Sequence, residues 1–182
     1  MEIIDGVAKM RSMRSILSLE KMSQYLKDNG VKTMVEIGSY SGESSEVFAN
    51  YFEKVYCVDP WQPFYDDNDP ASDTDMIKVE ELFDKVCKRH PNIIKMKMTS
   101  EEAFNQLKSD DIHFVYIDGN HQYLSVKKDV LMWFTVAELF LGGHDYHKTM
   151  FRSVYDAVND VFLEKEITKY YDTSWTVELK NI

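Results

Sequence analysis

Short apolar runs rich in β-branched or aromatic residues alternate along the chain with stretches in which apolar residues recur at helical spacing. The apolar runs predict seven strands, at 33–38, 54–59, 92–98, 112–118, 139–146, 167–171 and 175–179. The helical spacing predicts six helices, at about 12–28, 43–52, 76–89, 100–108, 123–137 and 151–162. This alternation is typical of repeated βα units and a mostly parallel α/β sheet, to which the last two strands add an antiparallel hairpin.

Local signals mark some of the predicted boundaries. Gly30 follows the first helix and predicts its end. Thr99 or Ser100, followed by Glu102, resembles the start of another helix. The stretch 60–75, rich in proline and aspartate, predicts a long loop after the second strand.

The length and composition fit one folded unit. The chain has 182 residues, of which 44% are apolar and 13% aromatic, enough to fill a sizeable core. We therefore expect a single domain over 1–182, with an N-terminal helical segment at 1–30 and the sheet-bearing core at 31–182.

The net charge of -10 and the pI near 4.9 disfavour some partners. Nucleic acids and anionic membranes attract proteins with clustered Lys and Arg, so we expect neither as a partner. Lys9, Arg11 and Arg14 form a local exception, which we interpret as a solvated helix face.

The cysteines and the apolar runs suggest a cellular compartment. Cys57 and Cys87 stand apart with no second pair, so the sequence predicts neither a zinc motif nor a disulfide framework. The first residues lack the apolar core of a secretory signal, and no run is long enough to predict a membrane span. We therefore expect a cytoplasmic location.

Polar residues follow five of the predicted strands. In an open parallel sheet, ligands bind at the carboxyl ends of the strands, near the point at which the strand order reverses. The polar ends are 36–42, Asp59, 99–101, 118–121 and 144–146. We therefore expect the functional site to be built from these five ends.

Two glycines and an acid give this site its first chemical character. Gly38 and Gly42 bracket the turn after the first strand, where a missing Cβ permits positive φ and close approach of a ligand. A plain tight turn would show the same pair. Asp59 favours a ligand, because an acid about 20 residues after a glycine turn suits a ribose diol. A solvated strand-end aspartate is the alternative interpretation.

Four segments together resemble class I S-adenosylmethionine-dependent methyltransferases. They are VEIGSYSGESSEVFA from Val35, VYCVDPW from Val55, FVYIDGNHQYLSVKKDV from Phe114 and GGHDY from Gly142. The group of small-molecule O-methyltransferases that includes macrolide-sugar and rhamnosyl enzymes is the most similar, over roughly residues 34–162. The resemblance implies a Rossmann-like, doubly wound sheet of seven strands with helices on both faces, and S-adenosylmethionine as the methyl donor.

The resemblance also implies which residues bind the donor. They are Glu36, Gly38, Ser39, Tyr40, Ser41, Gly42, Asp59, Pro60, Trp61, Ser100 and Asp118. Residues 39–41 would wrap the amino-acid end of the donor, Asp59 would bind the ribose, and Ser100 would meet the adenine edge. Pro60 and Trp61 would border the nucleoside.

The reactive residues implied around the acceptor are Asp118, His121, His144 and Asp145. An imidazole takes up a proton near neutral pH, although each histidine could instead order its loop. Asp118 and Asp145 could hold a magnesium ion through carboxylate oxygens. His144 precedes Asp145 where another acid would complete the ligand set, so magnesium is an optional part of the hypothesis. The loop at 61–75 would cover the site.

The resulting hypothesis is O-methylation of a small molecule such as a sugar or a secondary metabolite. Transfer of the methyl group would depend mainly on holding the acceptor in line with it. Two alternatives stay open, a catalytically silent nucleoside-binding module and an NAD-dependent oxidoreductase. The second is disfavoured because EIGSYSG lacks the G-x-G-x-x-G spacing. A homo-oligomer is also left open.

Overall fold

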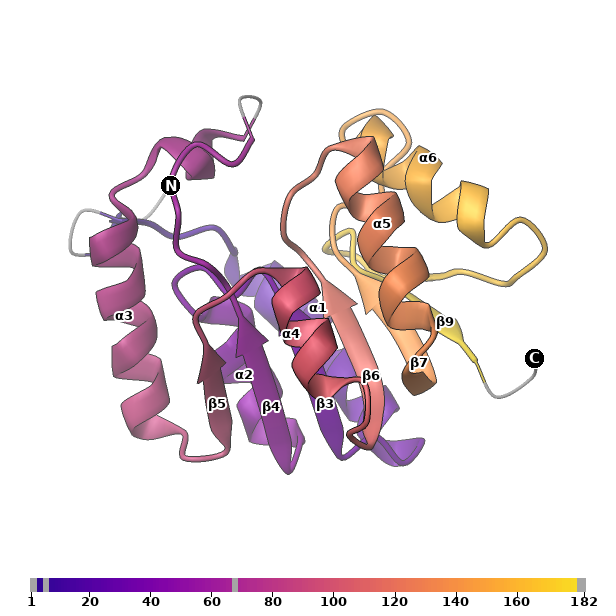
Figure 1. The fold of residues 1–182 in the computed structure, drawn as a ribbon, viewed down its shortest axis with the longest axis horizontal. Coiled ribbons are helices and arrows are strands. Elements are labelled where there is room, and N and C mark those ends of the chain that lie inside the picture. The colour runs from indigo at the N-terminus through magenta and orange to yellow at the C-terminus, as the bar shows by residue number, and fades with distance from the viewer. Residues whose placement is uncertain (1–2, 5–6, 67–68, 180–182) are drawn as a thin grey trace.

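The computed structural model describes residues 3–4, 7–66 and 69–179, arranged as in Figure 1. The strands are β1 (Ile3–Ile4), β2 (Val7–Ala8), β3 (Thr33–Ile37), β4 (Lys54–Val58), β5 (Ile93–Met96), β6 (Ile112–Ile117), β7 (Ala137–Gly143), β8 (Thr168–Lys169) and β9 (Trp175–Glu178). The helices are α1 (Met13–Asp28), α2 (Glu43–Tyr51), α3 (Met76–Arg89), α4 (Ser100–Leu107), α5 (Tyr123–Phe134) and α6 (Arg152–Val161). A short 3-10 helix, η1 (Pro70–Asp73), precedes α3.

Seven strands form one sheet in the order β5-β4-β3-β6-β7-β9-β8. Strand β3 pairs in parallel with β4 on one side and with β6 on the other. The chain therefore builds outward from β3 to β5 and then returns to the centre, so that the strand order reverses between β3 and β6. Strand β9 runs antiparallel to both of its neighbours. The predicted seven-stranded, mostly parallel sheet with a C-terminal hairpin is confirmed.

Hydrophobic layers cover both faces of the sheet, because side chains alternate along each strand. Val35 and Val115 face the layer that packs against α4, α5 and α6. Met34 and Phe114 face the layer of α1, α2 and α3. In Figure 1, α4 and α5 lie in front of the sheet and α1 and α2 lie behind it. The doubly wound arrangement leaves the carboxyl ends of the strands as the open edge of the core.

The predicted helix signals at Gly30 and Thr99 are confirmed. Helix α1 is followed by Gly30 at φ +91°, a left-handed conformation that glycine adopts without strain. Helix α4 begins with a capping box, in which Glu102 N–H donates to Thr99 Oγ1 and the Glu102 carboxylate accepts from Thr99 N–H. Local hydrogen bonds therefore explain both boundaries.

The boundaries predicted around β7 are wrong. Helix α5 ends at Phe134 rather than at residue 137, because Thr135 closes the last turn through its N–H and its hydroxyl, which both donate to Met132 O. Strand β7 begins at Ala137, in parallel register with β6, and ends at residue 143 rather than 146. The strand predicted at 167–171 is reduced to β8, and the small antiparallel pair β1 and β2 was not predicted.

Among the described residues, no helix combines the length and the apolar character that a membrane span requires.

The capping box yields a stability prediction. Thr99→Ala removes the acceptor that holds Glu102 N–H, and the free energy of unfolding should fall by about 1 kcal/mol. Thr99→Ser keeps a hydroxyl at the same position and should retain most of the stability. Urea denaturation of the two variants and the wild-type protein measures the difference, and equal stability of all three would show that the box contributes nothing.

Candidate active site

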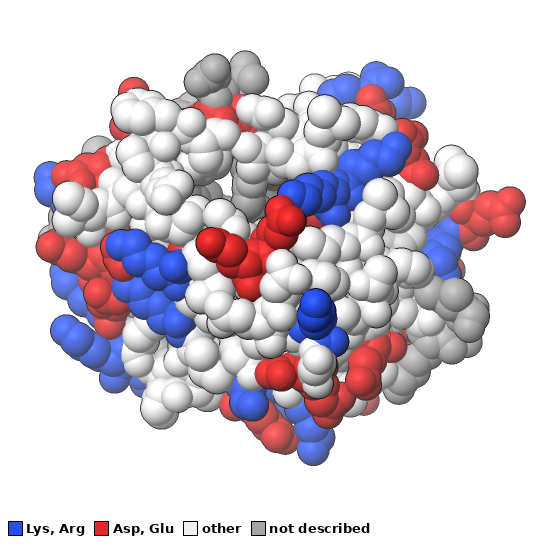
Figure 2. All heavy atoms as spheres, in the orientation of Figure 1, with Lys and Arg blue, Asp and Glu red and all other residues white. Residues whose placement is uncertain are grey.

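A cavity of about 550 Å³ opens at the carboxyl ends of β3, β6 and β7. Its wall comes from the turn after β3, the ends of β6 and β7, the loop before α3, the start of α6 and the N-terminal segment. The surface in Figure 2 is hollowed at this end of the sheet. The cavity therefore lies where the strand order reverses, the position at which doubly wound sheets bind ligands.

The structure brings together some of the predicted site residues and leaves others aside. Those that line the cavity are Gly38, Ser39, Tyr40, Ser41, Asp118, His121, His144 and Asp145. Those outside its lining are Glu36, Gly42, Asp59, Pro60, Trp61 and Ser100. In the loop predicted to cover the site, Tyr65 lines the cavity, whereas Phe64 is 72% exposed.

The turn after β3 holds its backbone directly against the end of β6. Gly38 has φ +87°, and a Cβ built on it would lie 2.1 Å from Asp118 O. Gly38 N–H donates to Val58 O and Asp118 N–H donates to Ile37 O, each at 2.8 Å. Tyr40 also has positive φ, at +45°. Only a glycine fits this approach, which sets the position of Asp118 relative to the turn.

Asp59 closes the same turn from the end of β4. Its carboxylate accepts hydrogen bonds from Tyr40 N–H at 2.9 Å and from Trp61 N–H at 2.7 Å. Burial raises the pKa of Asp59 above its ordinary value, and these backbone donors act in the opposite direction. The turn after β3 and the acid after β4, predicted to close around a single donor, are therefore in direct contact.

Trp61 is held in the protein interior. Its side chain is buried against the ring of Phe83, and its indole N–H donates to Tyr40 O at 2.9 Å. The neighbouring Pro60 is half-buried. Trp61 thus supports the glycine turn through this hydrogen bond. Its contact with the nucleoside stays a prediction.

Ser100 is engaged by the protein itself. Its hydroxyl donates to Asp129 Oδ1 at 2.7 Å and accepts from Trp133 Nε1 at 2.9 Å. These bonds tie the start of α4 to α5. To contact an adenine edge as predicted, the Ser100 hydroxyl would have to share or give up its hydrogen bonds with Asp129 and Trp133.

Two acids and two histidines form a compact cluster at the ends of β6 and β7. His144 Nδ1 lies 2.8 Å from Asp145 Oδ1 and 3.6 Å from Asp118 Oδ1. His121 Nε2 lies 3.3 Å from Asp145 Oδ2 and 3.6 Å from Asp118 Oδ1. Asp145 is buried and has φ +59°, an uncommon conformation for a residue with a side chain. The four predicted reactive residues are therefore together.

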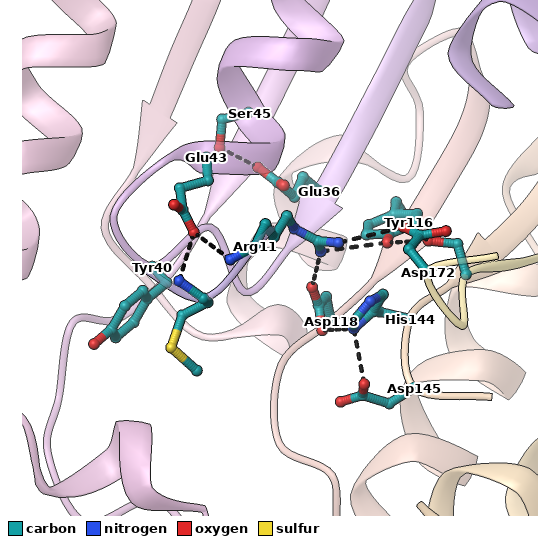
Figure 3. Close-up of polar contacts among 12 residues, drawn as sticks. Arg11, Glu36, Tyr40, Glu43, Ser45, Tyr116, Asp118, His144, Asp145 and Asp172 are labelled. Atoms are coloured by element: carbon teal, nitrogen blue, oxygen red, sulfur yellow. Dashed lines mark hydrogen bonds and ion pairs between the residues drawn. The ribbon is translucent and has the colours of Figure 1, made fainter. Parts of the chain in front are cut away.

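The interpretation of Arg11 as part of a solvated face is wrong. Its side chain is 6% exposed, and Nη2 donates to Asp118 Oδ2 at 2.6 Å. Nη2 also lies 3.4 Å from the Tyr116 hydroxyl, and Nη1 lies 3.5 Å from Asp172 Oδ2. Figure 3 shows the guanidinium between these three side chains. One arginine among three basic residues gives no sequence signal for this burial, because its partners come from distant strands and turns.

The N-terminal segment is fastened to the first residue of α2. Glu43 Oε2 accepts from Met10 N–H at 2.8 Å and from Arg11 N–H at 3.0 Å. Asp172 is held in turn by Ser18 and Ser174, each donating a hydroxyl at 2.8 Å. The Arg11 backbone is therefore fixed at Glu43, and its guanidinium is fixed by the turn that carries Asp172.

The charges of the cluster shift the pKa values of its members. Burial alone disfavours the ionised Asp118, but the positive charges of His144, His121 and Arg11 outweigh it and hold the pKa of Asp118 below its ordinary value. Burial favours neutral His121, yet Asp118, Asp145 and Asp69 raise its pKa to about 9. Burial also opposes charge on His144, and the two acids raise its pKa. Both imidazoles are therefore favoured as cations beside the acids.

Several buried polar atoms of the cavity wall have no hydrogen-bond partner among the described residues. They are Arg11 Nη1, Ser39 Oγ, Tyr40 Oη, Glu43 Oε1 and His121 Nε2. Of these, Arg11 Nη1 and His121 Nε2 still lie in ion pairs, with Asp172 and Asp145. Buried polar groups in folded proteins are nearly always hydrogen-bonded, and an unpaired one is costly. Donors and acceptors gathered around one cavity indicate a polar ligand with groups of both kinds.

One group of side chains around the cavity could also hold a metal ion. Ligand atoms of Asp118, His121 and Asp145 lie within 4.8 Å of one another. Arg11 already occupies Asp118 Oδ2, and an imidazolium cannot ligate a metal. Magnesium prefers oxygen ligands, so the cations beside the two acids make this group a poor magnesium site.

The doubly wound sheet and the cavity at its reversal point have the architecture in which nucleotide-binding folds hold their ligands. A family model described as a methyltransferase domain matches residues 35–139. The chain therefore belongs to this methyltransferase family. The resemblance to class I S-adenosylmethionine-dependent methyltransferases is confirmed, and the protein is an enzyme of that class. A search of curated proteins finds no match.

Solved structures support the fold. The calicheamicin methyltransferase CalS11 has a TM-score of 0.72 at 12% identity, with 94% of this chain and 81% of CalS11 covered. An O-methyltransferase from Bacillus cereus in complex with SAH has a TM-score of 0.64 at 11% identity, covering 94% and 83%. An rRNA methylase from Streptococcus thermophilus has a TM-score of 0.61 at 11% identity, covering 94% and 97%. Since these neighbours include both a calicheamicin and an rRNA enzyme, the fold does not select the acceptor.

The contact at Gly38 yields a second prediction. Gly38→Ala places a Cβ 2.1 Å from Asp118 O at positive φ, and the free energy of unfolding should fall by about 2 kcal/mol or more. Gly119→Ala is the matched control, because its Cβ would lie 3.6 Å from Ile37 Cγ2 in ordinary contact. Denaturant unfolding measures both, and similar losses in the two variants would contradict the role given to Gly38.

The raised pKa of His121 yields a third prediction. Since the pKa is about 9 in the folded protein and about 6.5 when unfolded, protonated His121 stabilises the fold fully below pH 6.5. This stabilisation is lost as the pH rises through 9. His121→Gln should therefore lower the free energy of unfolding by about 1–3 kcal/mol at pH 6, with the difference fading above about pH 9. Urea titrations across this range measure it, and a difference that grows with pH would contradict the assignment.

Proposed function

We propose that the protein transfers a methyl group from S-adenosylmethionine to a hydroxyl oxygen of a small polar molecule, such as a sugar or a secondary metabolite. The observation that carries this proposal is the gathering of buried donors and acceptors that form no hydrogen bond with the described residues around one cavity of about 550 Å³ at the strand-order reversal. A zwitterionic amino-acid end and a hydroxylated acceptor would supply partners of both kinds. CalS11, a TDP-rhamnose 3'-O-methyltransferase of the same fold, is compatible with such an acceptor.

The donor side of the cavity is the turn after β3. Residues 38–41 line the cavity, and this is the stretch assigned to the amino-acid end. Glu36 is fully buried behind the turn and accepts from Ser45 Oγ, so that it supports the turn. Asp59 would hold the ribose from the next strand end. Bound here, the donor supplies an electrophilic methyl group on sulfur.

The acceptor side is formed by the acid and histidine cluster together with the start of α6. A hydroxyl acceptor loses its proton as it is methylated, and an unprotonated side chain must receive that proton. His121 and His144 lie beside Asp118 and Asp145, which stabilise an imidazolium once it forms. Positive charge placed beside Asp118 would lower the pKa of both histidines, because like charges repel. A histidine that loses its proton under this charge would serve as the base.

Magnesium is the part of the sequence-based hypothesis that the site supports least. Asp118 and Asp145 could offer oxygen ligands, but Arg11 and two histidines already neutralise them. No step of the proposed reaction requires a metal. Transfer would rest on positioning of the acceptor and on the charges of the protein's own side chains.

The surface charge favours a small acceptor over a nucleic acid. On the face shown in Figure 2, acidic and basic side chains are interspersed. The whole chain carries a net charge of -10, whereas nucleic-acid binding is driven by clustered positive charge. We therefore rank RNA and DNA acceptors below a small molecule.

Calorimetry with S-adenosylhomocysteine and with NAD separates the methyltransferase from an oxidoreductase. We expect binding of S-adenosylhomocysteine and none of NAD, and binding of NAD alone would defeat the proposal. A catalytically silent module would bind S-adenosylhomocysteine but show no turnover. Incubation with labelled S-adenosylmethionine and a panel of sugars, nucleotide sugars and phenols tests that alternative.

A fourth prediction concerns the ribose. Asp59→Ala should weaken S-adenosylhomocysteine binding at least about tenfold, because one or two charge-assisted hydrogen bonds are lost. Asp59 also holds Tyr40 N–H and Trp61 N–H, one on each carboxylate oxygen, so Asp59→Asn, which keeps one acceptor oxygen, should lose less affinity than Asp59→Ala. Both variants should lose affinity in calorimetry, and unchanged affinity in both would show that the ribose lies elsewhere.

A further inference from the structure

The N-terminal segment contributes a cation to the wall of the donor site. Arg11 lies outside the matched family region of 35–139, yet it lines the main cavity together with Gly38 and Ser39. Its backbone is fixed at Glu43, immediately after the glycine turn, and its guanidinium reaches Asp118 at the end of β6. Since Asp118 O lies against Gly38, the arginine side chain spans the carboxyl end of β3. This is the position assigned to the amino-acid end of the donor.

The guanidinium does not use all of its donors in hydrogen bonds. Nη2 is bound to Asp118, whereas Nη1 is buried, forms no hydrogen bond with the described residues and lies 3.5 Å from Asp172 Oδ2. The fork is rigid, because Tyr116 and Asp172 hold it and Ser18 and Ser174 hold Asp172. A preorganised guanidinium with a donor that forms no hydrogen bond is suited to a carboxylate.

The neighbouring groups complement the other charge of an amino acid. Glu43 Oε1 is buried without a hydrogen-bond partner, and Glu43 and Asp118 both line the cavity. An ammonium group needs such acceptors, whereas a carboxylate needs donors such as Arg11 Nη1 and Ser39 Oγ. The atoms without a hydrogen bond thus form two sets, acceptors for the ammonium group and donors for the carboxylate.

We propose that Arg11 binds the α-carboxylate of the donor's amino-acid part, so that the N-terminal segment forms one wall of the donor site. The inference rests on the proposed function, since it requires S-adenosylmethionine in this cavity. It makes Arg11 a binding residue with selectivity for donors that carry the carboxylate. Asp118 and Glu43 then receive the ammonium group.

The test compares S-adenosylhomocysteine with its decarboxylated analogue, which keeps the ammonium group and lacks the carboxylate. Calorimetry on the full chain should show that Arg11→Ala weakens S-adenosylhomocysteine at least about tenfold and changes the affinity of the analogue by less than about threefold. Arg14→Ala is the matched control from the same segment, because Arg14 is exposed, and it should leave both affinities unchanged.

The outcomes separate the inference from the function on which it rests. Equal losses for both ligands in Arg11→Ala would overturn the inference, because Arg11 would then act only by ordering Asp118. If the wild-type protein binds neither ligand, the proposed donor itself is wrong.

A second variant covers the case in which removal of the buried cation prevents folding. Arg11→Lys keeps the charge beside Asp118 and Asp172 but loses the fork. It should weaken S-adenosylhomocysteine by about threefold to tenfold and leave the analogue unchanged. Loss of selectivity between the two ligands supports the inference, and wild-type selectivity in a folded Arg11→Lys protein overturns it.

Discussion

The contact between Gly38 and the backbone of Asp118 is the constraint on which the site depends. The absence of a Cβ lets the turn after β3 lie directly against the end of β6, where the strand order reverses between these two strands. Asp59 fastens the same turn from β4 through two backbone N–H groups. This junction positions the site. Asp118 follows β6 directly, and His144 and Asp145 follow β7, which pairs with β6.

Charge placement is the second organising feature. Asp118 and Asp145 are surrounded by Arg11, His121 and His144, so the buried acids are paired rather than isolated. Arg11 also ties the N-terminal segment to the C-terminal turn through Asp172. The same residues that stabilise the closed fold therefore create the electrostatic environment in which a charged donor and a hydroxyl acceptor can be held.

Sequence patterns predicted the fold because its signals are local. Periodicity gave the seven strands, and the signals at Gly30 and Thr99 gave helix ends that depend on nearby hydrogen bonds. Glycine spacing similarly located the turn. Arg11 was misjudged because its burial depends on Asp118, 107 residues away, which no local pattern records. The bonds that Ser100 makes to α5 are also tertiary, and they could not be foreseen from its place after a strand.

The central claim is that the turn after β3 and Asp59 bind two parts of a single donor molecule, its amino-acid end and its ribose. A crystal structure of the protein with S-adenosylhomocysteine tests it most directly. The account predicts the amino-acid end over residues 38–41 and the ribose hydroxyls on the Asp59 carboxylate, with the sulfur directed toward Asp118 and the histidines. A ligand bound elsewhere, or in this cavity with its ribose away from Asp59, would contradict the account.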